Sequence, residues 1–535
     1  NAAATNQVDE NGDVIINGNQ TGSVITIQSL SDSMSVELYG LRIFNGRSDK
    51  GGGIFANNTW LEMDQCRVLN NQTAGQGSQG GGIYAINSTV IAYQSDIEDN
   101  NTDDLPGLGA GVYAENSLVY LYDDSRINNN NSSSGSGGGI YAIGPGTYLE
   151  IHNSNVNNNS SNQKGGGLYL TDSSHVYLSD SSRVSYNTTL TQGGGVYLEY
   201  GSGLSAEENT VISKNLTTQD CFTGQGSKGA GLYVSQSTVE YNGGYIWGNE
   251  SADAGGGLFV TDGSSVFLSF VGMDSNKSAE VGGGENTIGG ALGIVYDSEV
   301  NFDHCTVFLN SSTSGGVGGL YAENSNINIS SSIFWDNPGE WNSESGQLIG
   351  SDYNVAYSDI QNGYPGEGNI DADPLFCNTF YYELAENSPA VGAAQDGSDM
   401  GHAGIECEPI YQDYIESVEI FVSGQSAEFN VSVDGNYDHF HWNVDYGETF
   451  MSNQATMIHD LSVGLHRFAA YLVNGDHGPV SNPFVQHFLV QDTVDVYFSE
   501  NFDADDSTAL ENWGFSSNNQ YGWEINNENL FSFSI

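Results

Sequence analysis

Short apolar stretches alternate with glycine and polar residues over the first two-thirds of the chain, and they return in the same order. A Gly-Gly-Gly-aliphatic-aromatic segment, such as GGGIYA at 80 and again at 137, opens a repeat. An alternating stretch such as VYLY at 119–122 follows, and a short aliphatic run then precedes an asparagine. Alternation with a period of two is typical of β-strands, and the intervening Gly, Asn, Ser and Asp residues favour turns. We therefore predict about three short strands in each repeat.

Two residue types mark the repeat along the chain. Tyr84 and Tyr113 are 113 − 84 = 29 residues apart, and Tyr141 and Tyr169 are 169 − 141 = 28 residues apart. Such a nearly constant period indicates a repeat architecture. The aromatic marker stands at Phe55, Tyr84, Tyr113, Tyr141, Tyr169, Tyr197, Tyr233, Phe259 and Tyr321. The asparagine marker stands at Asn71, Asn100, Asn130, Asn159, Asn187, Asn215, Asn249, Asn276 and Asn310.

A repeat of this length with three short strands is the size of one coil of a parallel β-helix. Stacked coils place equivalent residues ~4.8 Å apart, so an asparagine at a fixed turn can hydrogen-bond to the same residue in the next coil. A β-propeller fits less well, because its blades have about 40 residues and four strands. By strand alternation the small and aliphatic residues face the interior, so we expect the aromatic side chains to form a continuous stripe outside it. Their default role is stacking, with sugar binding by Tyr84, Tyr113, Tyr141, Tyr169, Tyr197 and Tyr233 as the alternative.

These glycine-aliphatic-aromatic repeats with asparagine ladders resemble right-handed parallel β-helices of the pectin-lyase-like class. They are most similar to the repeats of polymorphic outer-membrane and autotransporter-like surface proteins, over about residues 20–345. The resemblance implies an all-β protein, with a right-handed parallel β-helix of about ten to twelve coils in residues 1–345 and a small β-sandwich after it. The resemblance says little about function, because proteins with this fold include lyases, hydrolases and adhesins.

The sequence after the repeats no longer shows the glycine-aliphatic-aromatic pattern. Tyr357–Asp359, Gly368–Leu375 and Ala385–Ala390 resemble the choice-of-anchor Q module, which closes such helices, so the resemblance implies a cap at residues 346–410. We expect Cys377 and Cys407 to form a disulfide there because the module is short and the compartment is expected to be oxidising. Residues 411–491 show strand-like runs 8 to 12 residues apart, which suggests a small β-sandwich. Within them, HFHWNVDYG at 439–447 followed by LSVGLHRFAAYLVN at 461–474 resembles immunoglobulin-like spacer domains. In residues 492–535, YFSENFDADDSTALENWGF at 497–515 and YGWEI at 521–525 resemble the start of an incomplete jelly-roll or MAM-like module.

The charge balance excludes several partners. Lys and Arg number 11 against 67 Asp and Glu, which gives a net charge of −56. Nucleic acids and anionic membrane surfaces need basic patches, so neither is an expected partner. No apolar run approaches the ~18 residues of a membrane-spanning helix. The composition favours a salty extracellular or cell-surface setting, of the kind found in the sea, reached after removal of a signal peptide.

No residue set qualifies as a catalytic site. Arg42, Arg67, Arg126 and Arg183 stand at equivalent positions of the repeat, where a lyase could carry its base, but no carboxylate constellation recurs beside them. We expect them to be surface arginines. The acidic pairs Asp103–Asp104 and Asp123–Asp124 fall in turns, and hydrolases of this fold require paired acids on neighbouring coils. His439 and His441 share a strand face, with His459 and His466 as distant third ligands for a metal, and a structural role is expected.

Calcium is the one candidate cofactor, and no other is expected. Acidic loops could bind it at Asp371, Asp373, Asp503, Asp505 and Asp506, although their spacing differs from that of an EF-hand. Two long loops at the same turn, before Gly229 and before Gly289, are candidate ligand-binding loops. Their candidate residues are Asp220, Phe222, Glu280, Glu285 and Asn286.

Together these features favour a secreted or cell-surface adhesin, or an extracellular fibre component, without catalysis. Its partners would be glycans, a cell surface, or copies of itself in a filament. A polysaccharide lyase or glycoside hydrolase of the β-helix class is one alternative. A polymerising structural subunit is another.

Overall fold

The computed structural model describes residues 5–499 together with 515–517 and 523–525. Within 5–499 the description leaves out 9–13, 31–33, 104–105, 219–226, 279–292, 313–316, 340–346, 351–352, 378–381, 410–413, 424–425, 435–438, 446–449, 453–455, 463, 474–483 and 491–495. Every regular element among the described residues is a β-strand. These residues accordingly hold no helix long and apolar enough to cross a membrane.

The chain forms two compact units. The first comprises Asn1–Ala372 with Ala393–His402, and the second comprises Asp373–Gly392 with Ala403–Ile535. The predicted cap, residues 346–410, therefore contributes to both units.

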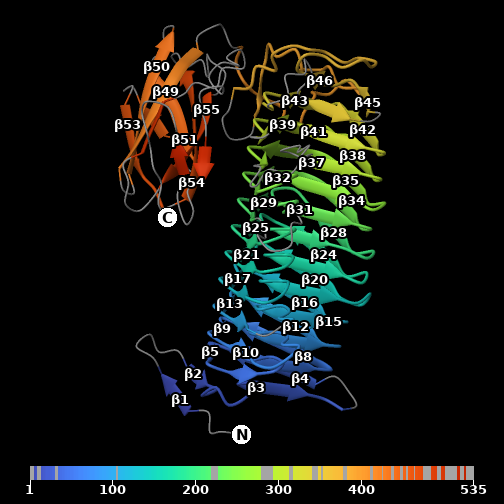
Figure 1. The fold of residues 1–535 in the computed structure, drawn as a ribbon, viewed down its shortest axis with the longest axis vertical. Coiled ribbons are helices and arrows are strands. Elements are labelled where there is room, and N and C mark those ends of the chain that lie inside the picture. The colour runs from blue at the N-terminus through green and yellow to red at the C-terminus, as the bar shows by residue number, and fades with distance from the viewer. Residues whose placement is uncertain are drawn as a thin grey trace. The chain divides into compact units, whose positions relative to one another are not determined.

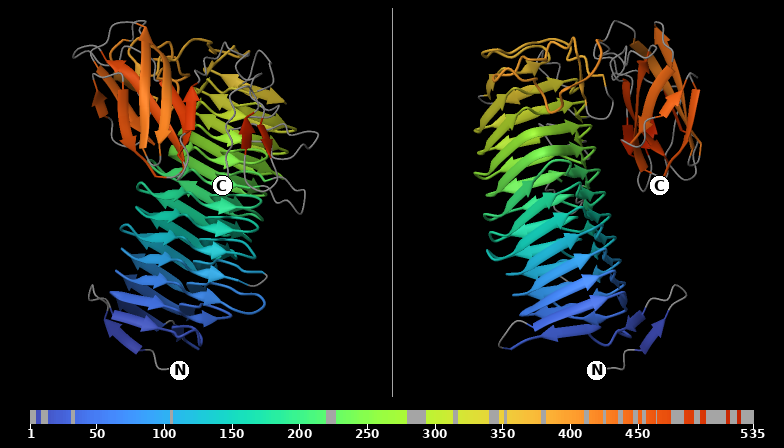
Figure 2. Two further views of the ribbon diagram at one scale, coloured as in Figure 1. Left: turned by 60° about the vertical axis from the view of Figure 1, so that its left-hand side comes forward. Right: turned by 180° about the vertical axis from the view of Figure 1, so that it is seen from behind.

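The first unit is a parallel β-solenoid of about 11 turns (Figures 1 and 2), which confirms the predicted fold class. One coil consists of β11 (Ile83–Ile86), β12 (Thr89–Tyr93), β13 (Asp96–Glu98) and β14 (Asn101–Thr102). The coil thus has three main strands, as predicted, and a fourth strand of two residues that the sequence pattern does not reveal. Each strand pairs in parallel with its equivalents in the coils before and after it.

Two stacks of strands carry most of the side chains discussed below. The first stack is β3 (Ile25–Gln28), β7 (Ile54–Asn57), β11, β15 (Val112–Glu115), β19 (Ile140–Ile143), β23 (Leu168–Thr171), β27 (Val196–Leu198), β31 (Leu232–Ser235), β34 (Leu258–Thr261), β37 (Gly293–Tyr296), β41 (Leu320–Glu323) and β44 (Leu348–Gly350). The second stack is β4 (Met34–Tyr39), β8 (Thr59–Asp64), β12, β16 (Leu118–Tyr122), β20 (Tyr148–His152), β24 (His175–Ser179), β28 (Gly203–Ala206), β32 (Thr238–Trp247), β35 (Ser265–Asp274), β38 (Glu299–Asp303), β42 (Asn326–Ser330) and β45 (Tyr353–Ala356).

Strand alternation fills the interior of the coils with aliphatic and small side chains. Ile83, Ala85, Val90, Ala92 and Ile97 of one coil are at most 1% exposed. Their equivalents in neighbouring coils join them in one continuous hydrophobic core. Burial of this apolar surface supplies the main favourable free energy of folding, at ~25 cal/mol per Å² removed from water.

The glycine triplet is required by the sharp return of the chain at the start of each coil. Gly80 has a φ of 67°, in the left-handed region that glycine occupies without steric cost. A Cβ on Gly82 would lie 2.6 Å from the carbonyl oxygen of Gly111 and 2.9 Å from Nδ2 of Asn100. Glycine at these positions therefore allows adjacent coils and the asparagine ladder to approach closely.

The predicted asparagine ladder is present and continuous. Oδ1 of Asn130 accepts hydrogen bonds from the backbone N–H and the side-chain Nδ2 of Asn100, both at 3.0 Å. Nδ2 of Asn130 in turn donates to the carbonyl oxygen of Ile97 and to Oδ1 of Asn159. The same pattern links the coils as far as Asn337, one coil beyond the predicted ladder. Each amide thereby satisfies buried turn groups that would otherwise lack partners.

The predicted aromatic ladder is also continuous, but it is buried rather than exposed. Successive rings from Phe55 to Phe259 stack with centroids 4.6–5.5 Å apart. They form a cluster separate from the aliphatic core, so the prediction that they lie outside the interior is confirmed. Tyr84, Tyr113, Tyr141, Tyr169, Tyr197 and Tyr233 are only 2–9% exposed. Because each ring face is covered by the next ring, stacking is the role that this packing favours.

Ionic groups close the hydroxyl edge of this stack. Glu199 accepts hydrogen bonds from the hydroxyl groups of Tyr169 and Tyr197 and from Nζ of Lys164. Lys164 also donates to the Tyr197 hydroxyl at 2.6 Å. Burial, aided by the Glu199 carboxylate, raises the pKa of Tyr141 to about 12. These tyrosines are therefore held in their neutral form.

A late segment of the first unit packs onto its last coils. The N–H of Gly401 donates to the carbonyl oxygen of Ser331 at 2.8 Å, and the N–H of His402 donates to Oγ1 of Thr306 at 3.1 Å. The His402 ring lies edge-on to Tyr245, at a centroid distance of 5.4 Å. It occupies the space left by Gly272, where a Cβ would lie 2.9 Å from Nε2 of the histidine. Burial lowers the pKa of His402 to about 4, so the ring is neutral at neutral pH.

The second unit contains two antiparallel sheets of four strands. One is β53 (Thr456–Asp460), β50 (Ser426–Asp434), β49 (Tyr414–Ser423) and β56 (Val496–Ser499). The other is β52 (Phe450–Ser452), β51 (His439–Val444), β54 (Gly464–Val473) and β55 (Phe484–Val490). Side chains from both sheets, including Phe429 and Phe468, share one hydrophobic core, as expected of a small β-sandwich.

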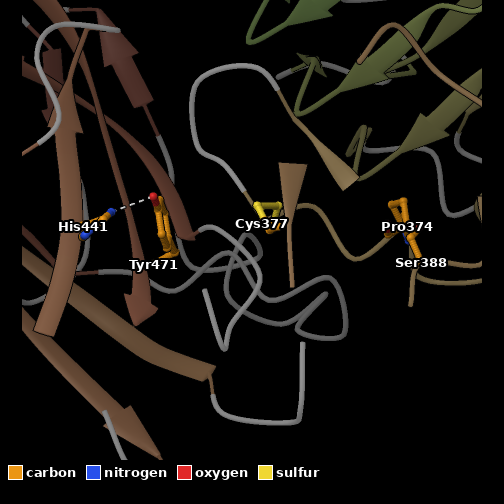
Figure 3. The surroundings of a disulfide bond; sticks show 6 residues. Pro374, Cys377, Ser388, His441 and Tyr471 are labelled. Atoms are coloured by element: carbon orange, nitrogen blue, oxygen red, sulfur yellow. Dashed lines mark hydrogen bonds between the residues drawn. A yellow bond between two sulfur atoms is a disulfide. The ribbon is translucent and has the colours of Figure 1, made fainter. Parts of the chain in front are cut away.

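The predicted disulfide is present in the second unit. Cys377 and Cys407 are bonded to each other, with their Cα atoms 6.2 Å apart (Figure 3). Nearby, Oγ of Ser388 donates to the carbonyl oxygen of Pro374 at 2.6 Å. The cross-link restricts the unfolded chain over 407 − 377 = 30 residues, which stabilises the folded state by about 3.6 kcal/mol on entropic grounds.

We predict that replacing one buried ladder amide weakens the solenoid. Asn130→Ala leaves the backbone N–H of Asn100 without its partner in a fully buried turn, so it lowers the free energy of unfolding by about 3 kcal/mol. The urea midpoint followed by tyrosine fluorescence measures the change. Asn242→Ala, at an exposed position of β32, is the matched control. Equal midpoints for the two variants would contradict the role assigned to the ladder.

We also predict an alkaline loss of stability that originates in the buried tyrosines. Burial, with Asp262 nearby, raises the pKa of Tyr233 to about 12, against about 10 in the unfolded chain. The stabilisation is therefore complete below pH ~10 and is lost as the pH rises toward 12, by about 1.4 kcal/mol per tyrosine at pH ~11. Tyr233→Phe preserves ring packing, since Phe259 already occupies the next position, and should make the decline between pH ~10 and ~12 shallower. Identical pH profiles for the variant and the native chain would refute this explanation.

Candidate functional site

The outer surface of the second strand stack carries a row of partly exposed aromatic side chains. In β12, Val90 and Ala92 point into the core, so alternation turns Tyr93 outward. The same alternation acts in β8, β16, β20 and β24, which lie side by side in register (Figures 1 and 2). We call the resulting surface the aromatic face. Its rings are Trp60, Tyr93, Tyr120, Tyr122, Tyr148, His152, His175 and Tyr177.

The rings of this face lie next to one another across four coils. Tyr122 stacks on Tyr93 at a centroid distance of 5.4 Å and lies 6.0 Å from Tyr120 on the same strand. Tyr120 is tilted toward Tyr148 at 6.5 Å, and Tyr148 stacks on His175 at 5.8 Å. These rings are half-buried, in contrast to the fully covered tyrosine stack. Trp60, at one end of the row, is 44% exposed.

Carboxylates stand among the rings. Glu62, Asp64 and Glu150 occupy outward positions of β8 and β20. The Tyr122 hydroxyl donates to Oε1 of Glu150 at 2.9 Å. Burial and this hydrogen bond raise the pKa of Tyr122 above its usual value, so the phenol stays protonated.

The two histidines of the face are hydrogen-bonded to small polar groups. Nε2 of His175 lies 3.2 Å from Oγ of Ser205, and burial lowers the pKa of His175, which favours the neutral ring. Nδ1 of His152 lies 3.0 Å from a carboxylate oxygen of Asp180 and 3.1 Å from Oγ of Ser179. The face thus combines flat apolar rings with hydroxyl, imidazole and carboxylate groups. Apolar ring surface with a few convergent polar groups is typical of sites for small molecules and sugars.

The four arginines noted in the sequence lie on the short strands that follow. Arg42, Arg67, Asp96, Arg126, Asn155 and Arg183 pair in register, one after another. Nε and Nη2 of Arg126 donate to both carboxylate oxygens of Asp96, at 2.8 and 2.9 Å. Arg67 donates to Glu98.

Two carboxylates thus lie beside two of the four arginines, and no group of three potential metal ligands forms around them among the described residues. Asp96 and Glu98 bind the guanidinium groups of Arg67 and Arg126, and alternation of opposite charges in one row reduces their repulsion. A guanidinium held in an ion pair is a poor proton acceptor, so neither Arg67 nor Arg126 is a good candidate for a lyase base.

The proposed loop residues Asp220, Phe222, Glu280, Glu285 and Asn286 lie outside the described residues, and so do Asp104, Asp503, Asp505 and Asp506. Asp371 and Asp373 are exposed, and each accepts a backbone hydrogen bond, from Asn362 and Leu375 respectively. Asp103, Asp123 and Asp124 are exposed near turns, as expected. Within the described part of the chain, no group of three potential metal ligands comes together.

The histidines of the second unit are engaged separately. Nδ1 of His441 lies 2.8 Å from the hydroxyl of Tyr471 (Figure 3). His466 is hydrogen-bonded to Asp445 and to the carbonyl oxygen of Ser462, and the His459 ring packs edge-on against Trp442. The His439 side chain lies outside the described part of the structure. These partners agree with structural roles.

Sequence reasoning missed the aromatic face. Its signal was present in the alternation of VYLY at 119–122 and HVYLS at 175–179, where every second residue is aromatic or polar. Recognising it requires knowing which coil residues become neighbours, and that depends on the register of this strand stack.

Comparison with known proteins does not extend this picture, because no protein-family model and no curated protein matches the chain.

Proposed function

We propose that the protein is an extracellular or cell-surface binding protein of the adhesin type, and that its aromatic face binds a glycan. One observation carries the proposal: on a solenoid whose other aromatic ladder is fully covered, this second row of rings is partly exposed. Contiguous exposed apolar surface is costly to maintain in water and commonly marks an interaction site.

The chemistry of the face suits a sugar. The C–H face of a pyranose ring packs against an aromatic ring, while its hydroxyl groups exchange hydrogen bonds with carboxylate, phenol and imidazole groups. Trp60 and Tyr148 offer ring surface, and Glu62 and Glu150 offer acceptors. Because the coils repeat at ~4.8 Å, the face offers several such contacts along the stack, and a polymer can use them together.

The remaining features support display outside the cell. The disulfide between Cys377 and Cys407 suits an oxidising compartment, and the scarcity of Lys and Arg disfavours intracellular anionic partners. The resemblances of the repeats to pectin-lyase-like surface proteins, of residues 346–410 to anchor-type caps, and of residues 411–491 to immunoglobulin-like spacers agree with this reading. Ion pairing of Arg67 and Arg126 with carboxylates favours binding over lyase chemistry at these two residues.

We predict that the protein retains a glycan on an array, and that Tyr120→Ala with Tyr148→Ala weakens binding of that glycan by about 100-fold, or about tenfold for each ring removed. Isothermal titration calorimetry measures the affinity. Tyr186→Ala removes a ring that is 50% exposed at a turn away from the face and is the matched control.

The same titrations separate the alternatives. Unchanged affinity in the double variant would place the ligand elsewhere and refute the role of the aromatic face. Depolymerisation of the retained glycan by the native chain would show an enzyme in place of an adhesin.

A further inference from the structure

Every formally charged side chain on the strands of the aromatic face is acidic. The five strands read TWLEMD, TVIAY, LVYLY, YLEIH and HVYLS, and none contains Lys or Arg. The charged members are Glu62, Asp64 and Glu150, and the two histidines are uncharged or paired with Asp180. Exposed Asp123 and Glu207, in the adjoining turns, add to the same sign.

One column of the face combines two carboxylates with apolar and aromatic side chains. Successive coils place Glu62, Ile91, Tyr120, Glu150 and Tyr177 next to one another in register. Glu62 and Glu150 are three coils apart, or ~14 Å at the usual strand spacing. A polymer lying along this column would meet Ile91 and the ring of Tyr120 between the two carboxylates.

This charge pattern discriminates among glycans. A polyuronate would bring its carboxylates against those of the face, in a protein whose net charge is already −56. A protonated amino group would donate charge-assisted hydrogen bonds to Glu62 or Glu150, and it would also be attracted to the tyrosine ring faces. A neutral glycan would gain only ordinary hydrogen bonds from the same groups.

We propose that the aromatic face selects a glycan that carries free amino groups, such as a polymer of deacetylated amino sugars. This inference rests on the proposed function, since it names the class of glycan for the same surface. The carboxylates provide the selectivity, and the rings provide the sugar-binding surface common to charged and neutral chains.

The test compares two oligosaccharides of equal length and linkage, the fully deacetylated and the fully N-acetylated β-1,4-linked glucosamine oligomers. Calorimetry with the full chain, at a pH where the amines are protonated, should give at least about tenfold tighter binding of the deacetylated oligomer at low salt. The preference should shrink as salt is added, because ions screen exposed charges.

Variants assign the preference to named residues. Glu62→Gln with Glu150→Gln removes both charges but keeps an amide oxygen as an acceptor at each position, so it should weaken binding of the deacetylated oligomer much more than binding of the N-acetylated oligomer and remove most of the preference. Asp297→Asn, an exposed acid near the other end of the solenoid, is the matched control and should change neither affinity.

The remaining outcomes overturn the inference in distinguishable ways. Equal or tighter binding of the N-acetylated oligomer, still lost in the Tyr120→Ala and Tyr148→Ala double variant, refutes selection for amines but leaves the proposed function standing. Binding of polygalacturonate in the presence of calcium likewise refutes selection for amines and leaves the proposed function standing. An oligolysine is also tested for displacing the deacetylated oligomer. If it does so as effectively as free deacetylated oligomer, and the Tyr120→Ala and Tyr148→Ala changes leave its binding unaffected, the face simply attracts cations and the inference is refuted. Failure of the array and of both oligomers refutes the inference and the proposed function together.

Discussion

Hydrogen bonding between successive coils, completed at one turn by the asparagine ladder, is the constraint on which the rest of the solenoid depends. Each strand must pair with its equivalent above and below, and each ladder amide must meet the next ladder amide. This requirement fixes the register of every coil. Once the register is fixed, like residues are stacked, and the surfaces of the solenoid become columns of repeated chemistry.

The protein contains two columns of aromatic side chains, of which one is buried and the other is partly exposed. Along the first strand stack the rings cover one another and, with Lys164 and Glu199 at their hydroxyl edge, form a second hydrophobic cluster. Along the second stack the rings alternate with carboxylates and remain partly exposed. The same repeating geometry thus yields a stabilising stack on one surface and a candidate binding surface on another, and neighbouring side chains decide which one forms.

Much of this architecture follows from the sequence. The glycine triplets and the regular asparagines predict the coil, because glycine is needed at Gly80 and Gly82 and an amide at Asn130 satisfies a buried turn. The disulfide between Cys377 and Cys407 could also be predicted. These features are encoded locally, or by the period alone.

The features that escaped prediction depend on contacts between coils. Burial of Tyr84 depends on neighbouring rings one coil away, so alternation predicts its direction but not its exposure. The ion pair between Arg126 and Asp96 joins residues 30 positions apart, and the repeat shows that they occupy equivalent positions but not that their side chains meet. The aromatic face likewise combines five strands, and only their stacking shows that Tyr120, Tyr148 and His175 are neighbours.

The claim that the aromatic face is the ligand surface is tested most directly by hydrogen–deuterium exchange of the full chain with and without the glycan retained on the array. The account predicts slower exchange, confined to peptides that contain β12, β16, β20 and β24, when the glycan is bound. Protection confined to residues 414–499, with no change in these strands, would contradict it.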